Sequence, residues 1–171
     1  MINGEQILRK KYPDLDENQY QPAGIDLKLG KIETFKTDKK FYGIIDDMKI
    51  LPERSELVQN ALSVNGQLRN VYTLRPMVPY MATVENKIKI SEDSLQNYKP
   101  RSSLLRCGTP VFTAIGDPGF NGHLSFLVMN LLPVDVVLTK GARFAQLEDI
   151  KVEGVMNGYD GDYNESWTRS R

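Results

Sequence analysis

Four short segments of the sequence combine residue types that could carry chemistry, and the richest is Pro100–Arg106. Arg101 presents a planar guanidinium with five donors, which suits a phosphate group. Ser102 and Ser103 add hydroxyl donors, and a turn or helix start here would add backbone N–H groups. Arg106 follows five residues after Arg101. The segment could bind an anion, or it could be a short helix capped by serine whose arginines face solvent.

A second segment, Ile115–Gly122, encloses Asp117 and Phe120 between two turn signals and leads into a strand. Asp side chains in such turns often accept hydrogen bonds from their own backbone. Taken alone, this pattern favours a structural β-turn.

The remaining two segments place polar side chains close to a glycine. Gly24 permits a tight backbone two residues before Asp26, and a lone strand Asp of this kind is usually a turn or edge feature. Gly141 begins a turn that leads into a strand carrying Arg143 and Gln146. Regular alternation puts these two side chains on opposite faces, so either could face solvent.

Composition limits the classes of protein that could use these segments. The chain has 171 residues, with 22 Lys plus Arg and 22 Asp plus Glu, so bulk attraction to nucleic acid is not expected. No apolar run approaches the roughly 20 residues of a membrane span, and no signal peptide is visible. The single Cys107 cannot form an internal disulfide, which fits a cytoplasmic setting, and one His with one Cys argues against a zinc site.

Periodicity predicts the elements that must position the four segments. Residues 3–12 form the best helical candidate, with Asn3 as N-cap and Pro13 as the stop. From residue 25 to 155 we count about ten short strands at roughly ten-residue spacing, which predicts an all-β sandwich or barrel. Residues 54–70 fit this pattern least, and we interpret them as an insertion with room for one helical turn.

The last sixteen residues, 156–171, are polar but carry Tyr159, Tyr163 and Trp167. Aromatic side chains in a polar tail usually have something to pack on. The tail could dock on the chain's own surface, or it could form an arm that closes over a ligand or a neighbouring subunit. We therefore expect a β domain at 1–155, with a possible insertion at 45–70, followed by a C-terminal arm.

Taken together and in order, the four segments resemble the motifs of the dUTPase and dCTP deaminase superfamily. Arg-Ser-Ser-Leu joined to Asp-Pro-Gly-Phe-x-Gly is a specific combination. The resemblance implies a distorted jelly-roll β-barrel, here with a short N-terminal helix, that assembles as a homotrimer with active sites shared between subunits. The matching segments are 21–30, 100–108, 117–130 and 141–147, with a tail at 159–169 similar to that of deaminases and deaminase-like dUTPases.

The residue at position 127 distinguishes between the two chemistries of the superfamily. Deaminases resemble Asp-Pro-Gly-Trp/Phe-x-Gly-x-Ile/Leu-Thr-Leu-Glu, whose final Glu shuttles protons at C4 of cytosine. In this chain the Glu position is Leu127, which has no titratable group for acid–base catalysis. His123 lies four residues earlier, and we do not expect it to replace the Glu.

The resemblance implies a role for each candidate residue. Asp117 would orient and deprotonate the attacking water, and Asp26 would meet Mg²⁺ through metal-bound water. Phe120 would pack on the deoxyribose, and the strand that holds Leu124 and Leu127 would offer its backbone to uracil. The expected phosphate contacts are Arg101, Ser102, Ser103, Arg106 and Gln146, and the expected tail contacts are Tyr159, Tyr163, Thr168 and Arg169.

The sequence therefore predicts a Mg²⁺-dependent dUTP diphosphatase that acts on a deoxyuridine nucleotide, with no nucleic-acid or membrane partner. One alternative is a dCTP deaminase or a bifunctional enzyme. A second is a nucleotide-gated regulatory protein built on the same scaffold. The Gly-rich arm with a Phe that ends many trimeric dUTPases has no counterpart in this chain, so the tail residues rest on the deaminase-like pattern.

Overall fold

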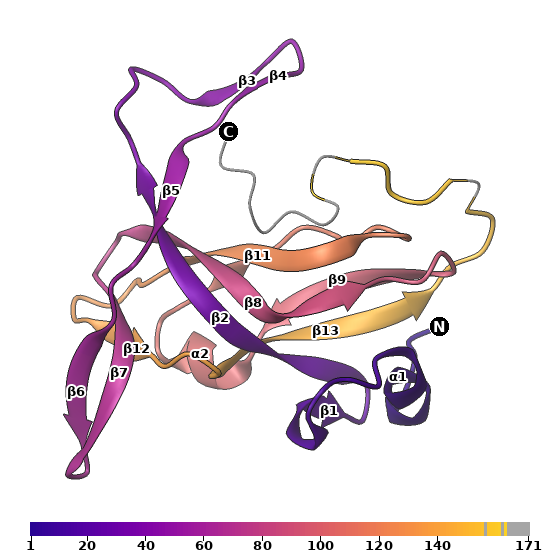
Figure 1. Cartoon of the computed structure of the whole chain (residues 1–171), viewed down its shortest axis with the longest axis horizontal. Helices are drawn as coiled ribbons and strands as arrows, with labels where there is room; N and C mark the ends of the chain where they lie inside the picture. The colour runs from indigo at the N-terminus through magenta and orange to yellow at the C-terminus, as the bar shows by residue number, and fades with distance from the viewer. Residues whose placement is uncertain (156, 162, 164–171) are drawn as a thin grey trace.

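The computed structural model describes residues 1–155, 157–161 and 163, and it shows a curved antiparallel sheet with two hairpins projecting from it (Figure 1). The main sheet curls into a near-closed barrel in which β2 lies between β8 and β13. Its strands, in spatial order, are β10 (Val111–Phe112), β11 (Asn121–Met129), β8 (Pro79–Lys89), β2 (Gly24–Lys36), β13 (Arg143–Lys151) and β9 (Ser94–Pro100), with β1 (Tyr20–Gln21) and β5 (Glu53–Glu56) pairing to β2.

Strand β2 joins the two halves of the sheet because its 13 residues change partner along their length. Its first half pairs with β13, and its second half pairs with β8 and β5. A register shift between Leu29 and Lys31 marks the change. Such irregularities bend and twist a strand, so the sheet curls around the fully buried Ile25, Leu27 and Ile32.

The N-terminal helix is present, but its cap differs from the expected one. Helix α1 (Glu5–Lys11) begins after Gly4, and no side chain caps it. Asn3 instead donates its side-chain amide to the buried carboxylate of Asp149 on β13. That prediction was wrong because a buried carboxylate far along the chain competes for the same amide. A one-turn 3₁₀ helix, η1 (Glu17–Gln19), follows.

Residues 43–74 form two hairpins with β5 between them, and no helical turn lies at 54–70, where we left room for one. Strands β3 (Gly43–Ile45) and β4 (Met48–Ile50) pair only with each other, and β6 (Asn60–Val64) and β7 (Gln67–Leu74) form a sheet with β12 (Val136–Leu138). The β6–β7 turn is Asn65-Gly66, with φ of 50° and 76°, which is a favoured two-residue hairpin turn. Whether this region is an insertion stays a prediction.

The all-β fold with a short N-terminal helix is thus confirmed. A second helix, α2 (Ser102–Arg106), is five residues long and follows β9 directly. In the part of the chain that the structure describes, no helix has the length and apolar character that a membrane crossing requires.

Candidate active site

Three adjacent strands bring the first group of predicted residues together. Asp26 on β2 lies opposite Gln146 on β13, and Gln146 in turn lies opposite Lys99 on β9. The Arg143 Nη1 is 3.2 Å from the Asp26 Oδ2, and the Arg101 Nε is 3.4 Å from the same oxygen. Two guanidinium groups therefore converge on one carboxylate, which leaves an excess of positive charge.

In this cluster of Asp26, Arg101 and Arg143, the carboxylate is buried and the two guanidinium groups are partly exposed to solvent. The Asp26 side chain is 2% exposed, whereas those of Arg101 and Arg143 are 31% and 34% exposed. Burial raises the pKa of the Asp26 carboxyl, and the two nearby guanidinium groups act in the opposite direction. Arg143 also donates to the Asn18 carbonyl at 2.8 Å, which orients its side chain. The cluster suits a polyanionic ligand.

Sequence reasoning left Arg143 open, and a β-bulge explains why. Regular alternation puts Arg143 and Gln146 on opposite faces of β13. The pairing shifts between Arg143 and Ala145, where two steps along β13 match one step from Lys28 to Leu27 on β2. This extra residue turns Arg143 toward Asp26. The lone signal in the sequence was the turn before the strand, and it does not reveal a bulge.

Gly24 has a packing role beside Gln146. A Cβ atom at Gly24 would lie 2.5 Å from the Leu147 carbonyl oxygen and 3.1 Å from the Gln146 Cγ. Only glycine fits at this close approach between β2 and β13. The Gln146 side chain thus packs against the backbone at Gly24, two residues from Asp26.

Helix α2 presents the serine hydroxyls, but serine does not cap it. Arg101 is the N-cap residue, and its carbonyl accepts bonds from the Leu104 and Leu105 amides. The Arg101 amide donates to the Phe144 carbonyl at 3.0 Å, which fixes the start of the helix on β13. The interpretation with serine as the cap was wrong, because the backbone conformation after Pro100 places Arg101 at the boundary.

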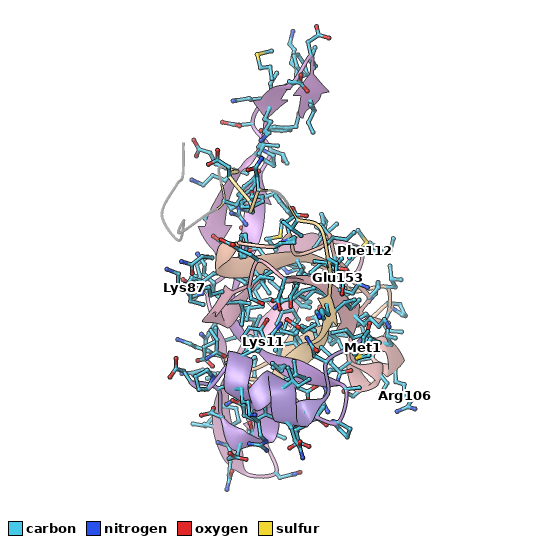
Figure 2. All side chains as sticks on the ribbon, turned by 90° about the vertical axis from the view of Figure 1, so that its right-hand side faces the viewer. Met1, Lys11, Lys87, Arg106, Phe112 and Glu153 are labelled. Atoms are coloured by element: carbon cyan, nitrogen blue, oxygen red, sulfur yellow. The ribbon has the colours of Figure 1, made fainter. Side chains whose placement is uncertain are left out.

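Exposure separates the remaining candidates on α2. Leu104 is buried and anchors the helix, whereas Ser102 and Ser103 are exposed in its first turn. Arg106 is exposed at its last turn, and its side chain points away from the sheet (Figure 2). Arg101 and the two serines therefore lie at one end of α2 and Arg106 at the other.

Asp117 lies in a second group, on a turn held at both ends. Before it, Gly116 exchanges two backbone hydrogen bonds with Gln96 on β9, at 2.8 and 2.9 Å. After it, Phe120 accepts from the Ile90 amide at 2.8 Å. The Asp117 side chain is exposed and forms no hydrogen bond or ion pair within the described residues. A solvated, unpaired carboxylate is thus presented on a fixed backbone.

The beginning of the tail packs on this turn. The Tyr159 amide donates to the Pro118 carbonyl at 2.7 Å, and the Tyr159 ring meets the Phe120 ring edge-on at 5.6 Å. Phe120 is half-buried and also packs against the core. Tyr163 is exposed, and the Lys49 ammonium on β4 lies 5.7 Å from its ring centre. Thr168 and Arg169 lie outside the described residues.

Among the described strands, β11 is paired along only part of one of its edges. Strand β8 runs along one side of β11, whereas β10 pairs only with Leu127 and Val128 on the other side. Leu124 is buried in the core, so only its backbone remains for a ligand, and Leu127 is half-buried. The His123 Nδ1 lies 3.2 Å from the Val84 carbonyl, and burial lowers the pKa of its ring.

The described structure shows no direct polar contact between the two groups. Within the described residues, no hydrogen bond or ion pair connects the Asp117 side chain to the Asp26 cluster. The described part of the chain also lacks a group of three His, Cys, Asp or Glu side chains that could hold a metal ion by themselves.

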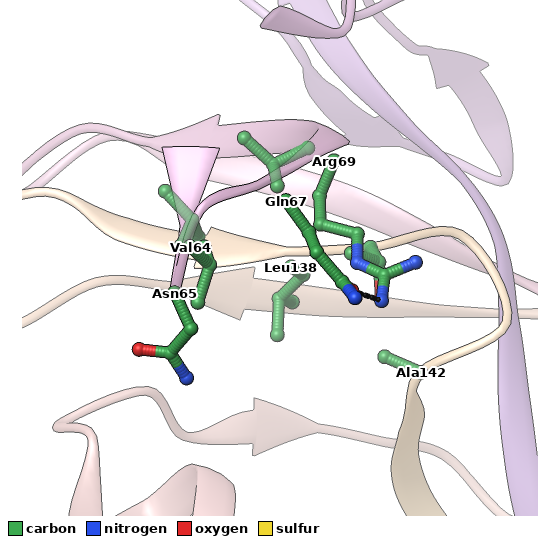
Figure 3. A pocket seen from close by; sticks show the side chains of 9 residues that line it. Val64, Asn65, Gln67, Arg69, Leu138 and Ala142 are labelled. Atoms are coloured by element: carbon green, nitrogen blue, oxygen red, sulfur yellow. Dashed lines mark hydrogen bonds between the residues drawn. The ribbon is translucent and has the colours of Figure 1, made fainter. Parts of the chain in front are cut away.

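A separate groove of about 540 Å³ lies under the β6–β7 hairpin, between Val64 and Ala142 (Figure 3). Its charged side chain is Arg69, which donates to Gln67 in the same groove. None of the predicted site residues lines it. The candidate residues named from the sequence therefore lie outside this groove.

Comparison with known proteins defines the class of this chain. Residues 3–148 match the model of a family described as dCTP deaminase-like, so the chain belongs to that family. The structure of 2'-deoxycytidine 5'-triphosphate deaminase from Agrobacterium tumefaciens has a similar fold, with a TM-score of 0.64 at 19% identity. The match covers 86% of this chain and 48% of that one, so the chain spans about half the length of the deaminase.

Similar sequences over the full length carry a more particular name. "Probable deoxyuridine 5'-triphosphate nucleotidohydrolase" from Methanopyrus kandleri is 39% identical over 95% of this chain and 99% of its own length. The protein of the same name from Methanothermobacter thermautotrophicus is 39% identical over 96% and 100%. A dCTP deaminase from Pyrococcus furiosus is 32% identical over 88% of this chain and 81% of its own length.

Proposed function

We propose that this protein is a dUTP diphosphatase, which hydrolyses dUTP to dUMP and pyrophosphate in the cytoplasm. The observation that carries the proposal is that Asp117 offers a carboxylate for a general base, whereas the chain lacks the Glu that a deaminase needs. Asp117 is exposed on a fixed turn, with no hydrogen bond or ion pair to another described residue, whereas the position of the deaminase Glu holds the half-buried Leu127. The relatives with the highest identity above are named for the same activity.

The Asp26 cluster would bind the triphosphate. Arg101 and Arg143 bring two positive charges against one buried carboxylate, so a net positive charge is left for phosphate oxygens. Ser102 and Ser103 are exposed beside Arg101, and their hydroxyl groups would donate hydrogen bonds to the phosphate oxygens. These donors would also hold the α-phosphorus in line with the attacking water.

Asp117 would act as the general base. Its carboxylate would accept a hydrogen bond from a water molecule and take its proton as the oxygen attacks the α-phosphorus. The bond from the α-phosphorus to the bridging oxygen breaks, and pyrophosphate leaves with the electron pair. A water-based mechanism needs no further acid on β11, which agrees with Leu127 at the position where a deaminase has Glu.

The residues present fit a magnesium ion held chiefly by the substrate. Both guanidinium contacts of Asp26 use its Oδ2, and its Oδ1 accepts no hydrogen bond from the described residues. Oδ1 could therefore face a metal-bound water. When bound, Mg²⁺ would neutralise phosphate charge, and Asp26 would be the protein residue that orients it.

Phe120 and the edge of β11 would recognise the nucleoside. The half-buried Phe120 ring would lie against the deoxyribose, and the backbone before Leu127 would pair with uracil along the edge that β10 leaves open. Tyr159 already contacts Phe120, so this part of the tail would border the same site. Tyr163, Thr168 and Arg169 would complete it, with Gln146 and Arg106 at the phosphates.

A homotrimer would bring the two groups together. Within the described residues the Asp117 side chain has no hydrogen bond or ion pair to the Asp26 cluster, and we infer that the turn of one copy lies beside the cluster of another. Light scattering at micromolar protein is expected to give three times the chain mass of 19.4 kDa. A monomer that still hydrolyses dUTP would contradict the shared site.

One incubation distinguishes the proposal from its alternatives. The protein would be mixed with dUTP, dCTP, UTP or dTTP and Mg²⁺, and pyrophosphate and ammonia would be measured together. Pyrophosphate from dUTP without ammonia from dCTP supports the proposal. Ammonia at a comparable rate would show a deaminase or a bifunctional enzyme, as the similarity to the Pyrococcus furiosus protein allows. Tight dUTP binding without turnover would instead indicate a nucleotide-gated regulatory protein.

A further inference from the structure

A network of buried polar side chains runs from β13 through Tyr12, the residue that ends α1, to β9. The Tyr12 hydroxyl donates to the Asp149 Oδ2 at 2.6 Å and accepts from the Gln96 Nε2 at 2.6 Å. The Tyr98 hydroxyl then donates to the Gln96 Oε1 at 2.7 Å. Asp149 and Gln96 are fully buried, and Tyr12 and Tyr98 are each 7% exposed.

At one end of this network, several hydrogen bonds hold the Asp149 carboxylate in place. Besides Tyr12, the Asp149 carboxylate accepts hydrogen bonds from Asn3, Lys11 and Ser94. Four donors thus converge on one buried carboxylate, three from the N-terminal segment around α1 and one from β9. A network whose members are all satisfied is rigid, because any rotation leaves a buried polar group unpaired.

At the other end of this network, the Tyr98 hydroxyl lies against Gly116, the residue before Asp117. A Cβ atom placed on Gly116 would lie 2.1 Å from the Tyr98 hydroxyl oxygen and 2.7 Å from the Ile90 Cδ1. The Tyr98 hydroxyl therefore packs directly against the Gly116 backbone, where any residue with a Cβ atom would clash. Gly116 also exchanges both of its backbone hydrogen bonds with Gln96, the residue that accepts from Tyr98.

The direction of the Tyr98 pKa shift agrees with this contact. Burial raises the pKa of Tyr98 strongly, and the negative charges of Asp117 and Asp149 raise it further. The Tyr98 hydroxyl thus stays protonated and donates its hydrogen bond to Gln96. Its ring is also locked against Phe126, at 4.9 Å between ring centres.

We propose that Tyr98 is a positioning residue for the catalysis assigned to Asp117, acting through Gly116. The hydroxyl, held by Gln96 and ultimately by Asp149, fixes the backbone from which the Asp117 carboxylate projects. The inference rests on the proposed function, because the positioning matters only if Asp117 activates water.

The first test is a double-mutant cycle. Tyr98→Phe removes one oxygen and keeps the ring, and it is expected to lower kcat for dUTP about 10- to 100-fold with KM within about twofold, since small displacements of a catalytic group cost that much. In an Asp117→Asn background the same change is expected to have no effect on kcat, because the residue it positions is already inactive. Equal losses in both backgrounds would overturn the inference.

Tyr80→Phe is the matched control. Tyr80 is 3% exposed, and its hydroxyl accepts from the Arg75 amide at 3.1 Å, away from the Asp117 turn. Tyr80→Phe also removes one buried hydroxyl, so it is expected to reduce the melting temperature by a similar amount while kcat stays within about twofold. A kcat loss equal to that of Tyr98→Phe would show that lost stability alone explains both variants.

A second measurement does not depend on activity. The Gly116 amide donates to the Gln96 carbonyl at 2.8 Å, so its hydrogen exchange reports how firmly the turn is held. Tyr98→Phe is expected to accelerate this exchange about tenfold or more relative to the Leu131 amide, which bonds to Gly108 elsewhere. Unchanged exchange would overturn the inference even if the variant were slow.

These two measurements also separate the two proposals. A wild-type chain that releases no pyrophosphate from dUTP would reject the proposed function, while the exchange rates would still decide whether Tyr98 holds the turn. If Tyr98→Phe does not fold, Tyr12→Phe breaks the same network one link earlier. It is expected to give a smaller kcat loss that again vanishes with Asp117→Asn, and a loss that persists there contradicts the proposal.

Discussion

Replacing Asp117 by Asn changes one exposed oxygen to an NH₂ group and leaves the shape of the side chain unchanged. Because the carboxylate has no hydrogen bond or ion pair within the described residues, no structural contact is lost. The backbone that carries it is held by Gln96 on one side and Ile90 on the other, and neither contact involves the side chain. The substitution therefore tests the basicity of the carboxylate nearly alone.

The expected effects on stability and on rate differ widely. A surface substitution without contacts changes the free energy of unfolding by about 0.5 kcal/mol or less. Loss of a general base lowers kcat by about 10²- to 10⁴-fold, which corresponds to roughly 3 to 5 kcal/mol of transition-state stabilisation. Removing a negative charge near a triphosphate also reduces repulsion, so nucleotide affinity should stay equal or become tighter.

The assay measures pyrophosphate release from dUTP, binding of a non-hydrolysable α,β-imido analogue of dUTP, and the melting temperature. Asp135→Asn is the control, because Asp135 is also an exposed carboxylate, on the loop before β12. It is expected to leave kcat, binding and the melting temperature unchanged. A folded Asp117→Asn variant with kcat within tenfold of the wild type would refute the role of Asp117 as the base.

Three further predictions follow from the same geometry. Arg101→Ala should raise the KM for dUTP about 10- to 100-fold, since a hydrogen bond to a charged group contributes about 1.5 to 3 kcal/mol; an unchanged KM would remove Arg101 from phosphate binding. Phe120→Ala should lower the dUTP-to-UTP ratio of kcat/KM about 10- to 100-fold, because an unpartnered 2′-hydroxyl is no longer excluded; an unchanged ratio with a lower melting temperature assigns Phe120 to packing against Tyr159. Burial raises the folded-state pKa of Asp26, so the wild type loses stability as pH rises through that pKa, whereas Asp26→Asn does not titrate. The melting-temperature difference, Asn minus wild type, should thus be larger at pH 7 than at pH 4, and a constant difference would contradict the argument.

The pattern of the main-sheet strands was predictable because their apolar residues alternate with polar ones and are buried. In β2, Ile25, Leu27 and Leu29 alternate with polar residues, and all three are fully buried. The β6–β7 hairpin was missed, although Asn65-Gly66 is a strong turn signal, because the strands on either side of it are largely exposed and show no clean alternation. A strand that buries few side chains has little need for alternating apolar and polar residues, so its sequence shows little of that alternation.

Single residues of the candidate site could be proposed from the sequence, but their arrangement could not. The motif residues Asp26 and Arg101 lie 75 positions apart, and only the pairing of β9, β13 and β2 brings them into contact. The bulge that turns Arg143 toward Asp26 depends on that pairing and has no local signature. The network behind Tyr98 likewise joins Tyr12, at the end of α1, to β9 and β13, so no spacing within one segment could reveal it.

The charge balance of the Asp26 cluster connects fold stability to ligand binding. Burial disfavours the charged form of Asp26, and the two guanidinium groups offset that cost while leaving one positive charge unmatched. A triphosphate would supply the missing negative charge where Arg101 and Arg143 are still accessible. If the proposed function holds, the charges of the cluster are better balanced in the nucleotide-bound state than in the free one, at some expense of stability in the free protein. Any nucleotide that binds there should stabilise the fold in proportion to the logarithm of its concentration over Kd, so binding and stability report on the same charges.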